Sequence, residues 1–172
     1  MFKQIQQIGV KFSDTLLETL DQIPRHRLPT RSSVEERFLE EDAFIAAIEK
    51  SVPPYSMIFQ LPYVPFPEYG PLNEMVDYDH LVGYLHSKSL RWSYGAMKYR
   101  ETDCWLSKVS AQPMDRLVPS IAAADFAGIY IDRFGYTDHA AALEAQLRAL
   151  LKSEPVTDAS GRYLFFRLDR QR

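Results

Sequence analysis

Several residue types that often reveal a function are scarce in this chain. A single cysteine, Cys104, occurs among 172 residues, which excludes an internal disulfide and a Cys-x-x-Cys metal site. Because Cys104 lies beside Trp105, we expect it to be a small buried residue rather than a nucleophile. The seven glycines form neither G-x-G-x-x-G nor G-x-x-x-x-G-K, and no serine stands in G-x-S-x-G. Neither dinucleotide binding, nor a P-loop, nor a nucleophile elbow is predicted, and no cofactor is expected.

Long apolar runs are also missing. The first ten residues are interrupted by Lys3 and three glutamines, so they lack the apolar stretch of a signal peptide. The best apolar run, Ile121–Ile131, contains Asp125 and is far shorter than the roughly 18 to 20 residues that a membrane span requires. The sequence therefore predicts neither a signal peptide nor a transmembrane segment.

Charge of one sign is not in large excess either. Twenty Lys and Arg against 23 Asp and Glu give a net charge of -3, and no basic block is long enough to follow a phosphate backbone. Nucleic acid is therefore not expected as a partner. The chain is nevertheless 46% hydrophobic and 13% aromatic, which is enough apolar material for the core of one domain.

The N-terminal part of the sequence is predicted to be separate from this domain. Phe12, Leu16, Leu20 and Ile23 recur at helical spacing, which is typical of an amphipathic helix that ends before a proline. A charged, proline-bearing linker follows. We therefore divide the chain into an N-terminal amphipathic helix and linker (1–31) and a single α/β domain (32–172), and we expect the first ~20 residues to pack weakly on that domain.

Helical and strand patterns alternate through the rest of the chain. The expected elements, in order, are a helix over 34–51, a strand over 57–61, a short helix over 77–86, a strand over 90–94, a helix around 117–122, a strand over 127–131, a helix from Thr137 or Asp138 to 151, and a hairpin of 155–157 and 163–168. A break of the first helix near Asp42 is one option, and Pro119 is expected in the first turn of its helix. This order predicts an α/β fold with a mostly parallel or mixed sheet, helices on both faces and a C-terminal β-hairpin edge.

Aromatic and charged side chains gather where the predicted strands end. Ligands of open parallel sheets bind beyond the carboxyl ends of the strands, and we expect 90–93 and 127–131 to be neighbouring strands. The ligand-binding candidates are Arg91, Trp92, Tyr94, Asp132, Arg133, Tyr136 and His80. Aromatic faces stack on sugar rings and arginines pair with phosphate, so a carbohydrate or glycerophosphate ligand is expected. The alternative is structural, with Asp132 and Arg133 as a solvent-exposed pair and the tyrosines covering the sheet edge.

One group of residues has the composition of a metal site, namely Asp77, Asp79 and His80. Two carboxylates supply too few of the six or more oxygens that calcium takes, so a turn capped by side chains is the simpler interpretation. His80 and His86 have a spacing that matches neither a helix-borne zinc pair nor a zinc finger. No metal site is expected.

Several segments of the chain, taken together, resemble a known family. They are Ile58–Tyr63, Pro65–Glu68, Tyr78–His80, Tyr84–Ser87, Leu90–Lys98 and Gly128–Arg133, the last followed by Gly135-Tyr136. These stretches are similar to the soluble C-terminal domain of large bacterial polytopic membrane proteins, a family described as glycan-modifying transferases, some labelled sugar or phosphoglycerol transferases. The similarity covers roughly residues 20 to 170.

The resemblance implies a location and a role. In the family a transmembrane helix leads into the segment that matches Asp21-Gln22, whereas here 12–20 is interrupted by polar residues, so the chain lacks the membrane part. Whether it is a fragment or a free-standing domain stays open. The family domain lies at the extracytoplasmic face of the bacterial inner membrane, and the donor and acceptor chemistry belongs largely to the membrane helices.

We therefore expect an accessory or ligand-binding domain of a cell-envelope glycan transferase that is not catalytic on its own, and catalytic residues are unknown. Its partners would be a carbohydrate or glycerophosphate ligand and the membrane-embedded part of a parent or partner protein. The alternative is a purely structural or protein-interaction domain that packs on membrane helices or on a partner chain. A third hypothesis is a small independent enzyme that uses Asp132 or His80 as a base.

Overall fold

The computed structural model describes residues 31–76 and 78–168. The amphipathic helix predicted near the N-terminus, the linker that follows it up to residue 30, and Asp77 lie outside the described residues. The chain divides between Arg37 and Phe38 into two compact units, and the sheet, the cores and the candidate site all belong to the second.

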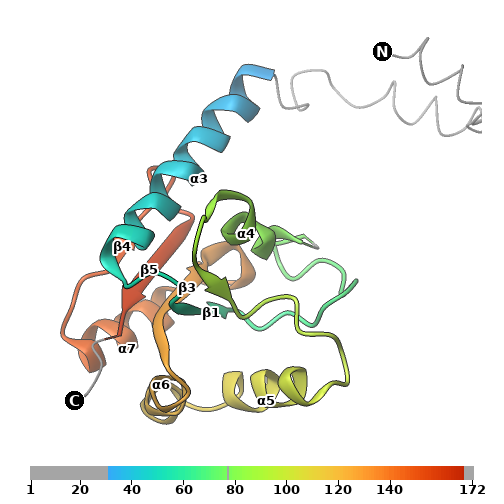
Figure 1. Cartoon of the computed structure of the whole chain (residues 1–172), viewed down its shortest axis with the longest axis vertical. Helices are drawn as coiled ribbons and strands as arrows, with labels where there is room; N and C mark the ends of the chain where they lie inside the picture. Colours follow the sequence, from blue (N-terminus) through green and yellow to red (C-terminus); the bar gives the residue numbers. More distant parts are fainter. Residues whose placement is uncertain (1–30, 77, 169–172) are drawn as a thin grey trace, which may run out of the picture. The chain divides into compact units, whose positions relative to one another are not determined.

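The described chain folds into helices around one five-stranded sheet (Figure 1). The elements are α3 (Arg31–Ser51), β1 (Met57–Leu61), η2 (Asp79–Leu81), α4 (Val82–His86), β2 (Arg91–Trp92), α5 (Glu101–Ser110), α6 (Met114–Ala123), β3 (Phe126–Asp132), η3 (Arg133–Gly135), α7 (Ala141–Leu151), β4 (Val156–Thr157) and β5 (Tyr163–Arg167). The strand order is β2-β1-β3-β5-β4, with β2, β1 and β3 parallel and the β4–β5 hairpin antiparallel at one edge. The predicted α/β class, mixed sheet and C-terminal hairpin edge are confirmed.

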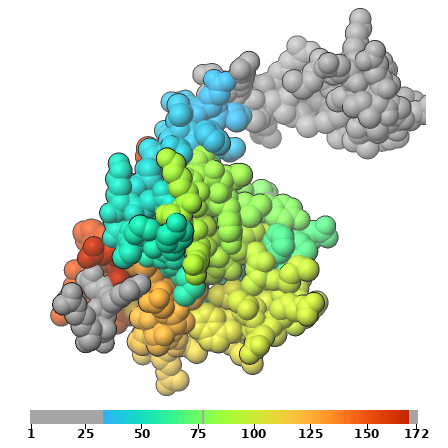
Figure 2. Space-filling view, viewed as in Figure 1, coloured from blue at the N-terminus to red at the C-terminus, as the bar shows by residue number. Residues whose placement is uncertain are grey.

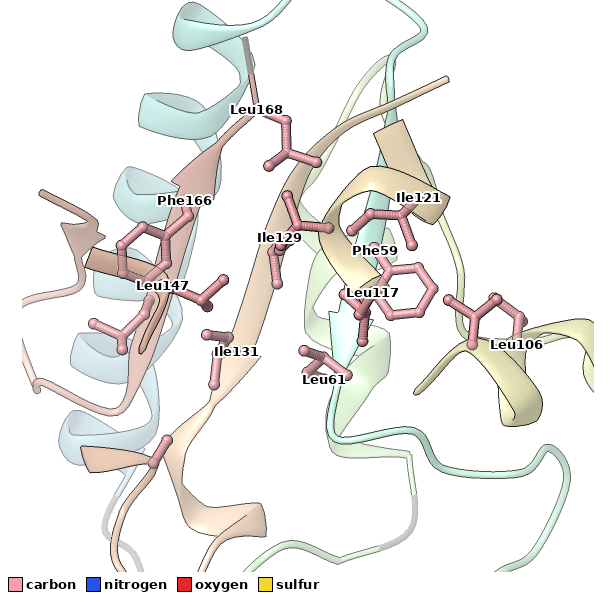
Figure 3. Packing of buried hydrophobic residues seen from close by; sticks show 14 residues of the cluster. Phe59, Leu61, Leu106, Leu117, Ile121, Ile129, Ile131, Leu147, Phe166 and Leu168 are labelled. Carbon is pink, nitrogen blue, oxygen red and sulfur yellow. The ribbon is translucent and has the colours of Figure 1, made fainter. Parts of the chain in front are cut away.

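The sheet is buried on both faces, as predicted. On one face, side chains of α5, α6 and α7 pack on the central strands around Phe59, Ile129 and Phe166 (Figure 3). On the other, α3 residues such as Ile45 and Ile48 pack with side chains of β1, β3 and β5. Strands covered on both faces need near-continuous apolar sequence, which is what β1 and β3 supply.

Close approach between β3 and β5 requires a glycine. A Cβ atom added to Gly128 would lie 2.3 Å from the ring of Phe165, which is closer than carbon atoms can pack. The missing side chain therefore lets the Phe165 ring cover the backbone of β3, and this fixes the hairpin against the parallel strands.

Three local expectations are corrected by the structure. Strands β2 and β3 belong to the same sheet but are not neighbours, because β1 pairs with both. Helix α3 runs without a break past Asp42. Pro119 lies in the interior of α6 rather than in its first turn. It is exposed to solvent, so water can reach the backbone carbonyl that the proline leaves without a donor.

Helix α7 begins at Ala141, three residues after Asp138, which is one of the two residues predicted to cap it. The Asp138 carboxylate accepts hydrogen bonds from the backbone N–H groups of Ala140 and Ala142, each at 3.0 Å, and so satisfies donors that the helix leaves open. Among the described residues, no helix is both long enough and apolar enough to cross a membrane.

Candidate functional site

The carboxyl end of β3 is occupied by an ion triad. Asp132 is fully buried, and Arg162 from the hairpin donates to both of its oxygens at 2.6 to 3.2 Å. The same guanidinium donates to Asp79 at 2.7 Å and lies over the ring of Phe134. The predicted alternative of a solvent-exposed Asp132–Arg133 pair is therefore wrong, because a hairpin residue far along the sequence neutralises Asp132.

Arg133 points to a different partner. Its guanidinium lies 2.5 Å from Glu144 of α7 and donates to the backbone carbonyl of Gly161 at 2.9 Å. Burial disfavours the charged carboxylate, but hydrogen bonds from Arg148 and Arg133 hold the pKa of Glu144 below its ordinary value. The guanidinium of Arg133 therefore ties the end of β3 to α7.

His80 is buried in a small polar network. Its Nε2 lies 2.8 Å from the carbonyl oxygen of Pro62, which can only accept, so Nε2 carries the proton in the neutral ring. The amide of Gln60 donates to the backbone oxygen of His80 and accepts from the N–H of Tyr94. Burial lowers the pKa of His80. The adjoining cavity of about 10 Å³ has room for one water molecule at most, not for a sugar.

Trp92 and Tyr136 are also held within the fold. The Trp92 indole N–H donates to Ser87 at 2.9 Å, and its ring meets Tyr130 edge to face in the core that faces α3. Tyr136 packs against the opposite core, and burial raises the pKa of its hydroxyl. Each of these aromatic rings serves the packing on its side of the sheet.

The seven predicted ligand-binding residues do not meet at one edge of the sheet. Arg91 is level with Met57, and Met57 is level with Phe126 at the amino end of β3. Asp132 lies at the other end of β3, about 20 Å away at the usual rise of an extended strand. Arg91 and Asp132 are therefore at opposite ends of the sheet, because the two-residue β2 pairs with the beginning of β1 and not with its end.

A cleft at the β2 edge takes in three of the predicted residues. It has a volume of about 440 Å³ and is bounded by β2 with the turn after it, one face of α5, and the first residues of β1 and β3. Its lining residues are Met57, Tyr84, Arg91, Trp92, Ser93, Tyr94, Gly95, Ala96, Thr102, Trp105, Leu106 and Phe126. Asp132, Arg133, Tyr136 and His80 are not among them.

The walls of the cleft are aromatic and well supported. The rings of Trp105 and Phe126 are stacked with an interplanar angle of 5° and centroids 6.2 Å apart. The ring of Phe59 meets Phe126 edge to face. The Tyr84 hydroxyl lies 2.9 Å from the backbone oxygen of Trp92 and 2.5 Å from that of Tyr94, and it donates to these edge carbonyls. Trp105 and Phe126 are both half-buried, so each of these supported rings lines the cleft with part of its surface.

Asp103 helps to hold helix α5 in place, together with the apolar contacts of Leu106 and Val109. This buried carboxylate accepts from the Tyr63 hydroxyl at 2.6 Å and from the backbone N–H of Tyr99 at 3.0 Å. Burial, and then the hydrogen bond to Asp103, raise the pKa of Tyr63 to about 12, so the tyrosine remains a donor at neutral pH. Figure 2 shows the surface of α5 (yellow) next to that of α6 (gold), and the two helices are in contact.

Arg91 is the one charged residue that lines the cleft. Its side chain is exposed, and within the described residues its guanidinium has neither an ion pair nor a hydrogen bond. Further polar groups come from uncharged lining residues, among them the hydroxyls of Ser93 and Thr102. The cleft can therefore offer a fork of N–H donors beside flat apolar rings.

Several of the lining residues were not predicted from the sequence. Trp105 and Thr102 belong to α5, a helix that was not predicted. Its buried face consists of Asp103, Leu106 and Val109, and because one of these three is charged, the apolar spacing of a helix is incomplete over 101–110. The acidic residues in the first turn of α5 are the signal that was available. Cys104 is exposed on this helix, so the expectation of a buried cysteine is wrong.

The described residues contain no group of three or more His, Cys, Asp or Glu side chains able to hold a metal ion. Comparison with known proteins adds no identity to this geometry: no protein-family model, no curated protein and no solved structure matches the chain.

Proposed function

We propose that this chain is a ligand-binding accessory domain, related to a cell-envelope glycan transferase, that holds an anionic sugar or glycerophosphate substituent in the cleft at the β2 edge. The observation that carries the proposal is the guanidinium of Arg91, which has no partner among the described residues and lines the cleft together with the stacked rings of Trp105 and Phe126. The link to a membrane transferase rests on the resemblance of the sequence segments described above.

The chemistry of the cleft suits such a ligand. Sugar rings present C–H faces that stack on aromatic rings, and Trp105 offers a half-buried indole for this purpose. Arginine binds phosphate or carboxylate through two parallel hydrogen bonds. No acidic residue lines the cleft to repel an anion. Because an open cleft buries little of a small ligand, we expect a Kd on the order of 0.1 to 1 mM.

The same lining favours binding without catalysis. General acid–base chemistry needs a carboxylate or imidazole within reach of the reacting atoms, and the cleft is lined by neither. His80 and Asp132 are buried in hydrogen bonds and ion pairs elsewhere in the domain. We therefore expect no sugar or phosphoglycerol transfer by the isolated chain.

NMR titration of labelled protein with glycerol phosphate and with glucose 1-phosphate tests the proposal. Backbone shifts are expected along β2 and α5, and Arg91→Met should weaken binding by about tenfold or more through loss of a charge-assisted pair. Arg91→Lys should retain part of the affinity, since a point charge replaces the fork.

Arg116→Met is the matched control, because Arg116 is an exposed arginine on α6 outside the cleft. It should leave the titration unchanged. Shifts confined to other surfaces, or none up to about 20 mM of either phosphate, would contradict the proposal.

A second candidate function, a packing domain for membrane helices or a partner chain, is favoured by a different surface. Tyr99 is 92% exposed and Met97 is 55% exposed. Met97 pairs with the backbone of Phe66, whose ring contacts exposed Tyr78. Exposed apolar residues next to one another are typical of interaction surfaces. Two results together would favour this second function. The first is that the cleft binds neither phosphate. The second is that the double variant Tyr99→Ser/Met97→Ser no longer associates with a membrane partner.

A further inference from the structure

A second hollow, shallow and open to solvent, lies on the outer face of α5 and shares Trp105 with the cleft. This hollow has a volume of about 490 Å³ and is lined by Glu101, Thr102, Cys104, Trp105 and Lys108, all from α5. Thr102 and Trp105 line both spaces. The half-buried indole of Trp105 is therefore a wall common to two adjoining depressions rather than the end of one.

A cation stands at each end of this surface. Arg91 lines the cleft on one side of Trp105, and Lys108 lines the hollow on the other. Lys108 is exposed, and within the described part of the chain its ammonium group has no ion pair. Thr102, Trp105 and Lys108 follow one another at three-residue steps on α5, so the path from Thr102 to Lys108 covers about 9 Å along the helix axis.

Resting on the proposed function, we infer that the ligand is an anionic saccharide of two or more units, lying across Trp105 from Arg91 to Lys108. A single sugar ring is shorter than the path of about 9 Å along α5 from Thr102 to Lys108, so it can occupy only one of the two depressions. An oligosaccharide places one ring in each, keeps Trp105 against a ring face and brings an acidic group to each cation.

Glu101 sets the register of such a chain. It lines the same hollow as Lys108 but lies about two helical turns away from it. A carboxylate accepts hydrogen bonds from sugar hydroxyls and repels acidic groups, so the acidic group of the second unit is directed toward Lys108. Once the first unit is bound, the second binds as an intramolecular event at high effective concentration.

Defined oligogalacturonates provide the probe, because each unit carries one carboxylate. We expect calorimetric titration to give at least tenfold tighter binding of the trimer than of galacturonic acid, and Lys108→Met to weaken the trimer while leaving the monomer unchanged. Lys50→Met, an exposed lysine in the last turn of α3, is the matched control. Neutral maltotriose should bind more weakly than the galacturonate trimer.

Cys104 supplies an independent readout, since it is the single cysteine of the chain, is exposed and lines the second hollow. Its alkylation by iodoacetamide should be slowed by the trimer and not by the monomer. Monomer and trimer affinities that are equal and both sensitive to Arg91→Met would overturn the extended site but leave the proposed function standing. If neither the monomer nor the trimer binds, and neither phosphate binds, both the extended site and the proposed function are wrong.

Discussion

Arg162 does more for the carboxyl end of the sheet than any other single residue. Its guanidinium donates to Asp132 and Asp79, and its planar face lies 4.5 Å from the ring centroid of Phe134 and 4.8 Å from that of Tyr163. Burial disfavours the charged guanidinium, but the hydrogen bond and charge of Asp132 raise the pKa of Arg162 overall. The cation is therefore bound tightly between two acidic groups and two rings.

Replacement of this arginine should be costly. Arg162→Met leaves the fully buried carboxylate of Asp132 without a counter-charge, and we expect the free energy of unfolding to fall by about 3 kcal/mol. Urea denaturation measures it. Arg148→Met is the comparison, because Arg148 pairs with Glu144 and Glu154 at a more exposed position. The loss of an exposed ion pair lowers the free energy of unfolding by about 0 to 1 kcal/mol. Equal losses for the two variants would show that the triad is not the stabilising element.

His80 makes stability depend on pH. Its pKa is lowered from 6.5 in the folded chain, mainly by burial, so between the folded and unfolded pKa values the unfolded chain binds the extra proton. The stability that neutral His80 contributes is fully present above pH 6.5 and is lost as the pH falls below that value. The slope is at most about 1.4 kcal/mol per pH unit.

Thermal unfolding of the wild type and of His80→Gln between pH 7.5 and 5 tests this expectation. Glutamine can still donate to the carbonyl of Pro62 but does not titrate, so the variant should show a shallower fall of the free energy of unfolding. Identical slopes in the two proteins would mean that the acid sensitivity arises elsewhere.

At the scale of elements, Gly83 decides how closely α4 approaches β2. A Cβ atom added there would lie 2.5 Å from the ring of Trp92. The indole cannot easily move, because it donates to Ser87 and rests against Tyr130. Glycine is a poor helix former, but at this position its missing side chain lets α4 pack directly on the ring of Trp92.

Gly83→Ala should consequently destabilise the protein even though alanine favours helix by about 1 kcal/mol. Overpacking against Trp92 costs about 1 to 3 kcal/mol, and we expect the net loss to be about 1 kcal/mol. Chemical denaturation measures it, with Gln146→Ala on the exposed face of α7 as a neutral control. A Gly83→Ala protein more stable than the wild type would refute the packing argument.

How far the elements could be predicted depends on what buries them. Strands β1 and β3 are buried by apolar contacts, so their sequence reveals them, whereas α5 is held partly by the hydrogen bonds of Asp103. A buried aspartate is indistinguishable in sequence from an exposed one, and the helix with its Trp105 wall is missed. The partner of Asp132 could not be predicted either. Arg162 lies in a hairpin that is brought beside β3 only when the sheet folds.

At the scale of the whole domain, both cores are built on the same strands. Phe59 and Ile58 alternate along β1 into opposite cores, and Ile129 and Tyr130 do the same in β3. Neither face can therefore lose its packing without removing support from the other. The two tryptophans report on the two sides, because Trp92 belongs to one core and Trp105 packs against the other.

Variants with one tryptophan each, Trp92→Phe and Trp105→Phe, allow the two sides to be followed separately by fluorescence. In each variant the fluorescence transition in urea should coincide with the transition seen by far-UV circular dichroism. A gap of more than about 0.3 M urea between the two probes in either variant would contradict a single cooperative unit.

The central pairing of the sheet also has a consequence during synthesis. Strand β1 binds β3 in parallel, yet Met57 meets its partner Phe126 only 69 residues later in the chain. While the ribosome adds the intervening residues, the apolar strand β1 has only the two-residue β2 as a neighbour in the sheet. Long-range parallel pairing is slow to form. An apolar strand that stays exposed and unpaired during this time is prone to aggregate. We therefore expect nascent chains that stop before residue 126 to recruit chaperones that bind extended apolar segments.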